Sequence, residues 1–259
     1  AGNKLESRLN GAASVSVNIA GIVPIAGLES DIDLPWPHVL MPYEKNKTLL
    51  QNAVYTCAMA GCKSIWIICN HDIQPIVKKI VGDSIEDPVY RFRSHARYAS
   101  EHKKHIPIFY APLPLRDMRK RDNVAWSAIF GCALSVKIFG QISTYTAPDK
   151  FFVAWPCAVL ENANLREHRK AISAEDLIIA SEGKDLFTND FLPFCFGRTQ
   201  LEALEEHCYR LNNPYVDAKA FEDLTLSEIF LPLAQNSRLE VNLGYKKVAC
   251  WEGYCSIFK

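Results

Sequence analysis

The sequence lacks an excess of charge of either sign. Lys plus Arg and Asp plus Glu number 29 each in a chain of 259 residues. A protein that binds nucleic acid mainly by neutralising phosphates carries a basic excess. The balanced charge therefore argues against sequence-specific nucleic-acid binding.

Long apolar runs are also missing. No segment reaches the roughly eighteen consecutive apolar residues that a membrane-spanning helix requires, so we expect no contact with a membrane. Residues 1–14 are small and polar, with no basic region followed by an apolar stretch, and are expected to form a flexible N-terminal arm rather than a signal peptide. Because no linker or repeat divides the rest, residues 15–259 are predicted to form a single α/β domain.

The cysteines lack the spacing of a metal site or a disulfide framework. They number nine, an odd count, and no C-x-x-C occurs. Most lie in apolar segments: Cys57, Cys62, Cys69, Cys132 and Cys157. We interpret them as reduced, buried small side chains, which predicts a reducing compartment such as the cytoplasm.

Several familiar catalytic motifs are absent as well. There is no G-x-S-x-G, no Walker loop and no G-x-G-x-x-G. Residues 181–185 superficially resemble a phosphate loop but lack its glycine spacing. His95, His102 and His105 do not have the spacing of a zinc site.

Strand-like and helix-like segments alternate in the first part of the chain. Residues 15–25 and 64–69 are short apolar runs typical of buried strands, whereas residues 48–60 have helical spacing and stop before Gly61. Further elements are expected at residues 72–81 (helix), 106–111 (strand), 123–139 (helix capped by Asp122 and ended by Gly140) and 150–158 (strand). This alternation predicts a Rossmann-like, doubly wound, mostly parallel sheet.

The second half is less regular. Helices are expected at residues 161–174 and 198–211, and Thr225 to Glu228 has the form of a capping box that opens another helix. Residues 239–243 and 246–251 are predicted to form a closing pair of strands around Gly244.

Residues 22–50 read IVPIAGLESDIDLPWPHVLMPYEKNKTLL, and residues 60–70 read AGCKSIWIICN. This order of strand, A-G loop, proline-rich spacer, helix and second strand resembles the opening of the nucleoside-diphosphate-sugar pyrophosphorylases, the sugar nucleotidyltransferases. The resemblance implies a nucleotidyltransferase fold of the glycosyltransferase-A-like architecture. It also implies magnesium-dependent transfer of a nucleotidyl group from a nucleoside triphosphate to a sugar phosphate or a similar phosphorylated small molecule.

The resemblance also assigns site residues. Gly27, Glu29 and Ser30 would line the phosphate loop, and His38 would replace the catalytic, phosphate-binding lysine of the family. Asn123 and Ala125 would lie near the nucleotide, and Glu252 would be the surviving metal carboxylate.

Departures from the family pattern keep a second hypothesis open. Glu29 stands where the family has its second glycine, and a carboxylate beside a triphosphate is electrostatically unfavourable. Trp155, Pro156 and Cys157 stand where the family places its metal aspartate. The chain could therefore be a catalytically degenerate pseudoenzyme that serves as a structural or binding subunit, with a protein partner or as a homo-oligomer. It could also bind a nucleotide or sugar nucleotide without turnover.

Two other polar features carry alternatives. Asn70, His71 and Asp72 follow the second strand and could contact a ligand, although Asp72 is also a natural helix cap. The basic residues between 91 and 105, and those between 116 and 121, could bind an anion or form a solvated surface.

Overall fold

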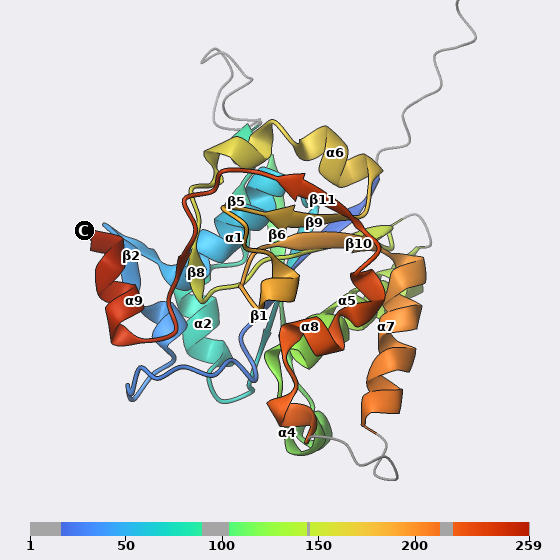
Figure 1. Ribbon diagram of the computed structural model, residues 1–259, viewed down its shortest axis with the longest axis horizontal. Helices are drawn as coiled ribbons and strands as arrows, with labels where there is room; N and C mark the ends of the chain where they lie inside the picture. The colour runs from blue at the N-terminus through green and yellow to red at the C-terminus, as the bar shows by residue number, and fades with distance from the viewer. Residues whose placement is uncertain (1–16, 90–103, 144–145, 213–219, 259) are drawn as a thin grey trace, which may run out of the picture.

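The computed structural model describes residues 17–89, 104–143, 146–212 and 220–258. The predicted N-terminal arm and most of the basic stretch between residues 91 and 105 lie outside these ranges. An eight-stranded sheet with the order β11-β9-β10-β7-β1-β4-β6-β5 forms the centre of the molecule (Figure 1). Its strands are β1 (Ile19–Pro24), β4 (Ser64–Cys69), β5 (Ser84–Glu86), β6 (His105–Pro112), β7 (Lys150–Val153), β9 (Leu177–Ala180), β10 (Phe194–Gly197) and β11 (Ser237–Glu240).

The middle of the sheet is parallel. β1 pairs in parallel with β4 on one side and with β7 on the other, and β4 pairs in parallel with β6. The chain thus runs outward from β1 through β4 to β6 and then crosses back to β7. That reversal makes the carboxyl ends of β1 and β7 a topological switch point, where open α/β sheets bind ligands.

The central strands are buried on both faces, which explains their continuous apolar sequences. Every residue of β1 and β4 is buried. Alternate side chains enter two different cores: Val23 and Ile67 face one, whereas Ile22 and Trp66 face the other. Helices therefore cover the sheet on both sides, as the doubly wound prediction requires.

Helix α1 (Leu49–Ala60) covers the first face. Its capping box is complete, because the Thr48 side chain accepts from the Gln51 N–H and the Gln51 side chain accepts from the Thr48 N–H. Gly61 ends the helix in the left-handed conformation, as predicted. Two smaller helices contribute buried residues to the same core, Val77 from α2 (Gln74–Val81) and Ile172 from α6 (Arg169–Ala174).

Helix α5 (Val124–Ile142) covers the second face and packs on β1, β4 and helix α7 (Arg198–Leu211). By length and composition alone, α5 is apolar enough to cross a membrane. Here its buried side chains, Ala128, Ile129 and Cys132 among them, belong to the core beneath the sheet. The helix begins one residue later than predicted and is capped by Asn123 rather than Asp122. The prediction that Gly140 ends it is wrong, since the helix continues to Ile142.

Several predicted elements differ from the structure. Residues 161–174 form a 3-10 turn (Asn162–Arg166) before α6, not one helix. The predicted closing strand pair is wrong, since β11 pairs with β9 and the short strand β12 (Lys246–Lys247) pairs with β8 (Ala158–Val159). Trp251 begins helix α9 (Trp251–Cys255).

The remaining elements are η2 (His38–Leu40), β2 (Pro42–Glu44), β3 (Lys47–Thr48), α4 (Leu115–Lys120), η5 (Leu186–Thr188), η6 (Phe221–Asp223), α8 (Leu226–Ile229), η7 (Leu231–Leu233) and η8 (Ser256–Phe258).

The cysteines are free, and seven of the nine are buried. This agrees with their interpretation as small apolar core residues. Cys250 is partly exposed and Cys255 is exposed on α9.

Candidate functional site

Two adjoining cavities open at the carboxyl edge of the parallel strands. Both are lined by the loop that follows β1, residues Gly27, Leu28 and Glu29, and by Asp122, which lies just before α5. Together they form a cleft at the position where the sheet topology predicts a ligand.

Gly27 shapes this cleft. Its φ of +72° lies in the left-handed region, and a Cβ atom built on it would lie 2.7–2.9 Å from backbone atoms of Asn123 and Val124. Glycine alone allows the β1 loop to turn there while touching the first turn of α5. The next loop residues, Leu28 and Glu29, are thereby held at the boundary between the two cavities.

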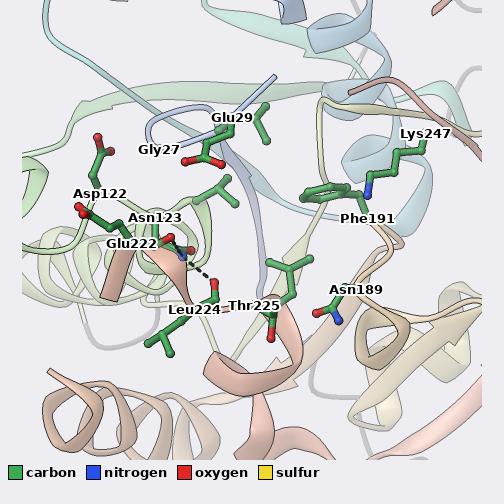
Figure 2. A pocket seen from close by; sticks show the side chains of 13 residues that line it. Gly27, Glu29, Asp122, Asn123, Asn189, Phe191, Glu222, Leu224, Thr225 and Lys247 are labelled. Atoms are coloured by element: carbon green, nitrogen blue, oxygen red, sulfur yellow. Dashed lines mark hydrogen bonds between the residues drawn. The ribbon is translucent and has the colours of Figure 1, made fainter. Parts of the chain in front are cut away.

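The first cavity has a volume of about 200 Å³ and is drawn in Figure 2. Residues from five separate parts of the chain line it. They are Gly27, Leu28, Glu29, Asp122, Asn123, Val124, Asn189, Phe191, Glu222, Leu224, Thr225, Leu226 and Lys247.

Asn123 joins two walls of this cavity. Its Oδ1 accepts from the Ala125 N–H and caps α5, while its Nδ2 donates to the Leu224 carbonyl at 2.9 Å and to the Glu222 carbonyl at 3.3 Å. The side chain is almost fully buried. It therefore holds the segment before α8 against the start of α5, and its polar atoms are already engaged within the protein.

The second cavity has a volume of about 300 Å³ and lies between the β1 loop, η2 and the start of α2. Besides the shared residues it is lined by Ile25, Pro37, His38, Val39, Asn70 and Ile73. His38 Nε2 and Asn70 Oδ1 are both buried, and neither has a hydrogen-bond partner among the described residues. Both residues line the cavity, but these two atoms have almost no accessible surface, so they are unsatisfied within the protein beside the cavity.

His38 stands on the short helix η2 and is only 6% exposed. Burial lowers the pKa of His38 from 6.5 to about 4, because a charged imidazolium loses its hydration there. The side chain is therefore neutral near pH 7. It can exchange a hydrogen bond with a ligand but cannot supply the positive charge of the family's lysine.

Charge is distributed unevenly along the cleft. The carboxylates of Glu29, Asp122 and Glu222 lie on one side of the first cavity, and Lys247 lies beside Phe191 on the other (Figure 2). Lys247 Nζ is 5.1 Å from the centre of the Phe191 ring. None of the three carboxylates forms an ion pair with a described residue, and all three are exposed to solvent, so the negative charge on this side is screened by water and salt.

The donor set does not fit a protein-built magnesium site. Within the described ranges, no three His, Cys, Asp or Glu side chains are close enough together to hold a metal ion. Trp155, at the position of the family's metal aspartate, is buried and donates from Nε1 to the Leu192 carbonyl. Glu252 is exposed on α9 and lines neither cavity.

The structure brings together four of the predicted site residues: Gly27, Glu29, His38 and Asn123 line the cleft. Besides Glu252, two others lie outside it. The Ser30 hydroxyl donates to the Ala249 carbonyl and accepts from the Ile32 N–H, which fixes the loop. Ala125 is fully buried in the first turn of α5.

Sequence reasoning missed most of the far wall. Asn189, Phe191, Glu222 and Lys247 reach the cleft from segments that showed no site motif. Thr225 also lines it, and the capping box predicted at Thr225 and Glu228 is confirmed, but that motif indicated a helix start and no site. Only Asn70 had a signal, because it directly follows a predicted buried strand. Asp122 was predicted to be a helix cap and instead contributes to both cavities.

No protein-family model matches the sequence, and a search of curated proteins gives no match. Solved structures do match along nearly the whole chain. One is a protein from Bacillus anthracis, described as a glucose-1-phosphate thymidylyltransferase, in complex with sucrose. It has a TM-score of 0.59 and 10% sequence identity, over 92% of this chain and 93% of that one.

Two further structures give similar values. Rv0371c from Mycobacterium tuberculosis has a TM-score of 0.53 and 15% identity, over 93% of this chain and 98% of that one. HddC from Yersinia pseudotuberculosis has a TM-score of 0.53 and 12% identity, over 94% of this chain and 100% of that one. At these identities the likeness shows the fold. The protein has a nucleotidyltransferase-like α/β fold, in agreement with the resemblance of its first strands and loops.

Proposed function

We propose that the protein binds a nucleoside triphosphate in the cleft and transfers its nucleotidyl group to a sugar phosphate or a similar phosphorylated small molecule. One observation carries the proposal. In a sheet with this fold, an open cleft lies at the carboxyl edge around the β1 loop, and two of its lining residues, His38 and Asn70, have buried polar atoms that lack partners among the described residues.

The reaction is a substitution at phosphorus. An oxygen of the acceptor phosphate forms a bond to the α-phosphorus, the bond from that phosphorus to the bridging oxygen breaks, and pyrophosphate leaves. In this proposal the β1 loop positions the phosphates by close backbone approach at Gly27. His38 gives a hydrogen bond from a neutral ring, and Asn123 holds the nucleotide wall in place.

Magnesium stays a prediction from the resemblance. Because the carboxylates of the cleft do not form a metal-binding group, we assign no step of the reaction to it. Adding magnesium in the assays below tests whether the nucleotide requires it.

The direct test is pyrophosphate release from each of the four nucleoside triphosphates, with a panel of sugar phosphates, with and without magnesium. We expect release with one nucleotide. His38→Gln should reduce turnover at least roughly tenfold if His38 contacts the substrate in the transition state, while Lys79→Ala on the exposed face of α2 serves as the control. Equal effects of the two substitutions would remove His38 from the mechanism.

A degenerate fold is the second candidate, and two observations favour it. The resemblance places Trp155, Pro156 and Cys157 where the family has its metal aspartate, and Trp155 is buried. The cleft carries three carboxylates that form no ion pair with a described residue, where a triphosphate would need positive charge. In that case the protein acts as a binding or structural subunit. Nucleotide binding without pyrophosphate release would indicate a sensor. Absence of both would favour assembly with a protein partner, in which the exposed Trp251 and Phe258 would be contact residues.

A further inference from the structure

Residues 246–258 connect the body of the protein to the loop that lines the cleft. At the start of this segment, Lys246 and Lys247 form β12 and pair with β8, and the Val248 N–H donates to the Cys157 carbonyl at 2.7 Å. Lys247 also lines the first cavity. The start of the segment is therefore fixed to the chain that follows β7, beside the cleft.

The middle of the segment holds the β1 loop by hydrogen bonds. The Ala249 carbonyl accepts from the Asp31 N–H at 2.9 Å and from the Ser30 hydroxyl at 3.2 Å. Among the described residues, these are the only hydrogen bonds that residues 29–36 make with another part of the chain. The position of this part of the loop therefore depends on the C-terminal segment.

Apolar contacts join the same two parts. A small apolar cluster, separate from the two main cores, lies between them. Its buried members are Ile32, Met41, Leu49 and Val248. Tyr254 packs against this cluster, and its hydroxyl donates to the Pro42 carbonyl at 2.6 Å where α9 lies beside β2 (Figure 1). The segment thus contacts the chain on both sides of His38, a residue of the cleft.

Helix α9 has no core of its own. None of its residues is buried. It rests on its own segment, because a Cβ atom on Gly253 would lie 2.5 Å from the Lys247 carbonyl oxygen and the Lys246 ammonium donates to the Ser256 carbonyl at 2.9 Å. An element with so few buried contacts opens at a small cost in free energy. Opening of α9 would release the β1 loop while the sheet stays folded.

We propose that residues 246–258 act as a latch on the cleft, with Tyr254 as a positioning residue. In the closed arrangement the latch holds the β1 loop and Lys247 where they bind the nucleotide, and detachment of α9 loosens both. The inference rests on the proposed function for the identity of the ligand. Because coupling between two sites is reciprocal, a nucleotide in the cleft stabilises the packed α9, although no residue of α9 lines either cavity.

The first test is hydrogen exchange of the full chain without nucleotide, followed at the Asp31 amide. Ser30→Ala and Tyr254→Ala leave the partner of this amide in place. Each should nevertheless speed its exchange roughly threefold or more, since a neighbouring contact of the latch is lost. Tyr254→Phe keeps the ring and should give a smaller increase. Tyr55→Phe on α1, which lines a separate cavity, is the matched control.

Exchange of the β4 amides reports whether the sheet stays folded, and it should not change in these variants. If Tyr254→Ala unfolds the sheet, the comparison between Tyr254→Phe and Tyr55→Phe decides. Exchange at Asp31 that is the same in the folded latch variants and in the control would overturn the proposal.

The second test adds ATP, GTP, CTP or UTP, with and without magnesium. We expect the nucleotide that binds to slow exchange in residues 250–258 roughly threefold or more. Tyr254→Ala should raise the Kd of that nucleotide by a similar factor, and Tyr55→Phe should not. Protection that reaches the β1 loop but not α9, together with an unchanged Kd in Tyr254→Ala, would contradict the latch.

Failure of the latch and failure of the proposed function give different results. Pyrophosphate release that is the same in Tyr254→Ala and the native protein would keep the proposed function and reject the latch. Faster loop exchange in the variants of a protein that binds no nucleotide would support the hold of the segment on the loop and reject the proposed ligand.

Discussion

At the scale of single residues, His38 and Gly27 show how the cleft depends on its local environment. His38 replaces a lysine in a family-like loop, but burial removes its charge and leaves one ring nitrogen without a partner. Gly27 keeps the family's first glycine, and here its lack of a side chain allows the β1 loop to touch α5. The first residue limits which charges the cleft can bind, and the second determines where its walls lie.

Because His38 is buried in its neutral form, we predict that the free energy of unfolding falls in acid. Its pKa is about 4 in the folded protein and 6.5 when unperturbed, so the unfolded chain binds more protons between these values. The free energy of unfolding contributed by His38 is therefore complete above pH 6.5 and is lost as the pH falls toward 4. Between pH 6.5 and 4, the free energy of unfolding of His38→Gln should therefore fall by about 2–3 kcal/mol less than that of the native protein.

The measurement is urea unfolding at several pH values between 4 and 7. His71→Gln, a change in an exposed loop residue, is the control. If the native protein and His38→Gln lose stability in parallel across this range, the buried imidazole is not the cause.

Gly27→Ala should destabilise the protein by about 2–4 kcal/mol, since it combines a left-handed backbone with a backbone clash. Gly183→Ala is a close match, because Gly183 has a φ of +76° and nothing within 4 Å of a Cβ. That control should cost only about 1 kcal/mol. Equal losses in chemical denaturation would show that the contact between the β1 loop and α5 is not tight.

At the scale of elements, the contact between α5 and the segment before α8 forms one wall of the cleft. Asn123 makes this contact with both ends of its amide. Asn123→Ala should lower the stability by about 2–3 kcal/mol, because the helix cap and the buried donors are lost together. Asn123→Ser keeps an acceptor for the cap and should recover about 1 kcal/mol.

Thermal unfolding of the two variants separates the two roles. If Asn123→Ser is no more stable than Asn123→Ala, the cap contributes little. If neither differs from the native protein, the bond to Leu224 does not hold the wall.

The elements that the sequence predicted well have strong local signals. Residues 64–69 form β4 and residues 198–211 form α7, with the expected bounds, since a buried apolar run and an amphipathic period are unambiguous. The strands β9 and β10 were missed because four apolar residues are too short for a clear pattern. Residues 246–251 looked like a strand, yet Cys250 Sγ accepts from the Gly253 N–H and starts a helix there.

The candidate site was predictable where the family resemblance reached. Gly27, Glu29 and His38 follow one another closely after β1, so a family-like spacing brought them together, and the resemblance also assigned Asn123. Glu222 and Lys247 follow Asn123 by about a hundred residues or more, and only the fold places them beside it. No sequence pattern could have indicated the uneven charge that these residues create.

At the scale of the whole molecule, the sheet order and the position of the cleft agree with a nucleotidyltransferase-like fold. The cleft itself differs from the site that the resemblance implies. Its histidine is neutral near pH 7. In the part of the chain that the structure describes, its carboxylates do not form a group of three that could hold a metal, and the cavity beside His38 is lined by no Lys or Arg. The comparisons thus show the fold, and the activity, the cytoplasmic location and the protein partners stay predictions.

The central claim, that the cleft around Gly27 and His38 binds a nucleotide, is tested most directly by thermal unfolding with each nucleoside triphosphate, with and without magnesium. A ligand that binds only the folded state raises the melting temperature. We predict a rise of several degrees with one nucleotide in the native protein and in Lys79→Ala, and a much smaller rise in His38→Gln. The account would be contradicted by a well-folded native protein whose melting temperature does not change with any nucleotide, or by a rise that His38→Gln leaves intact.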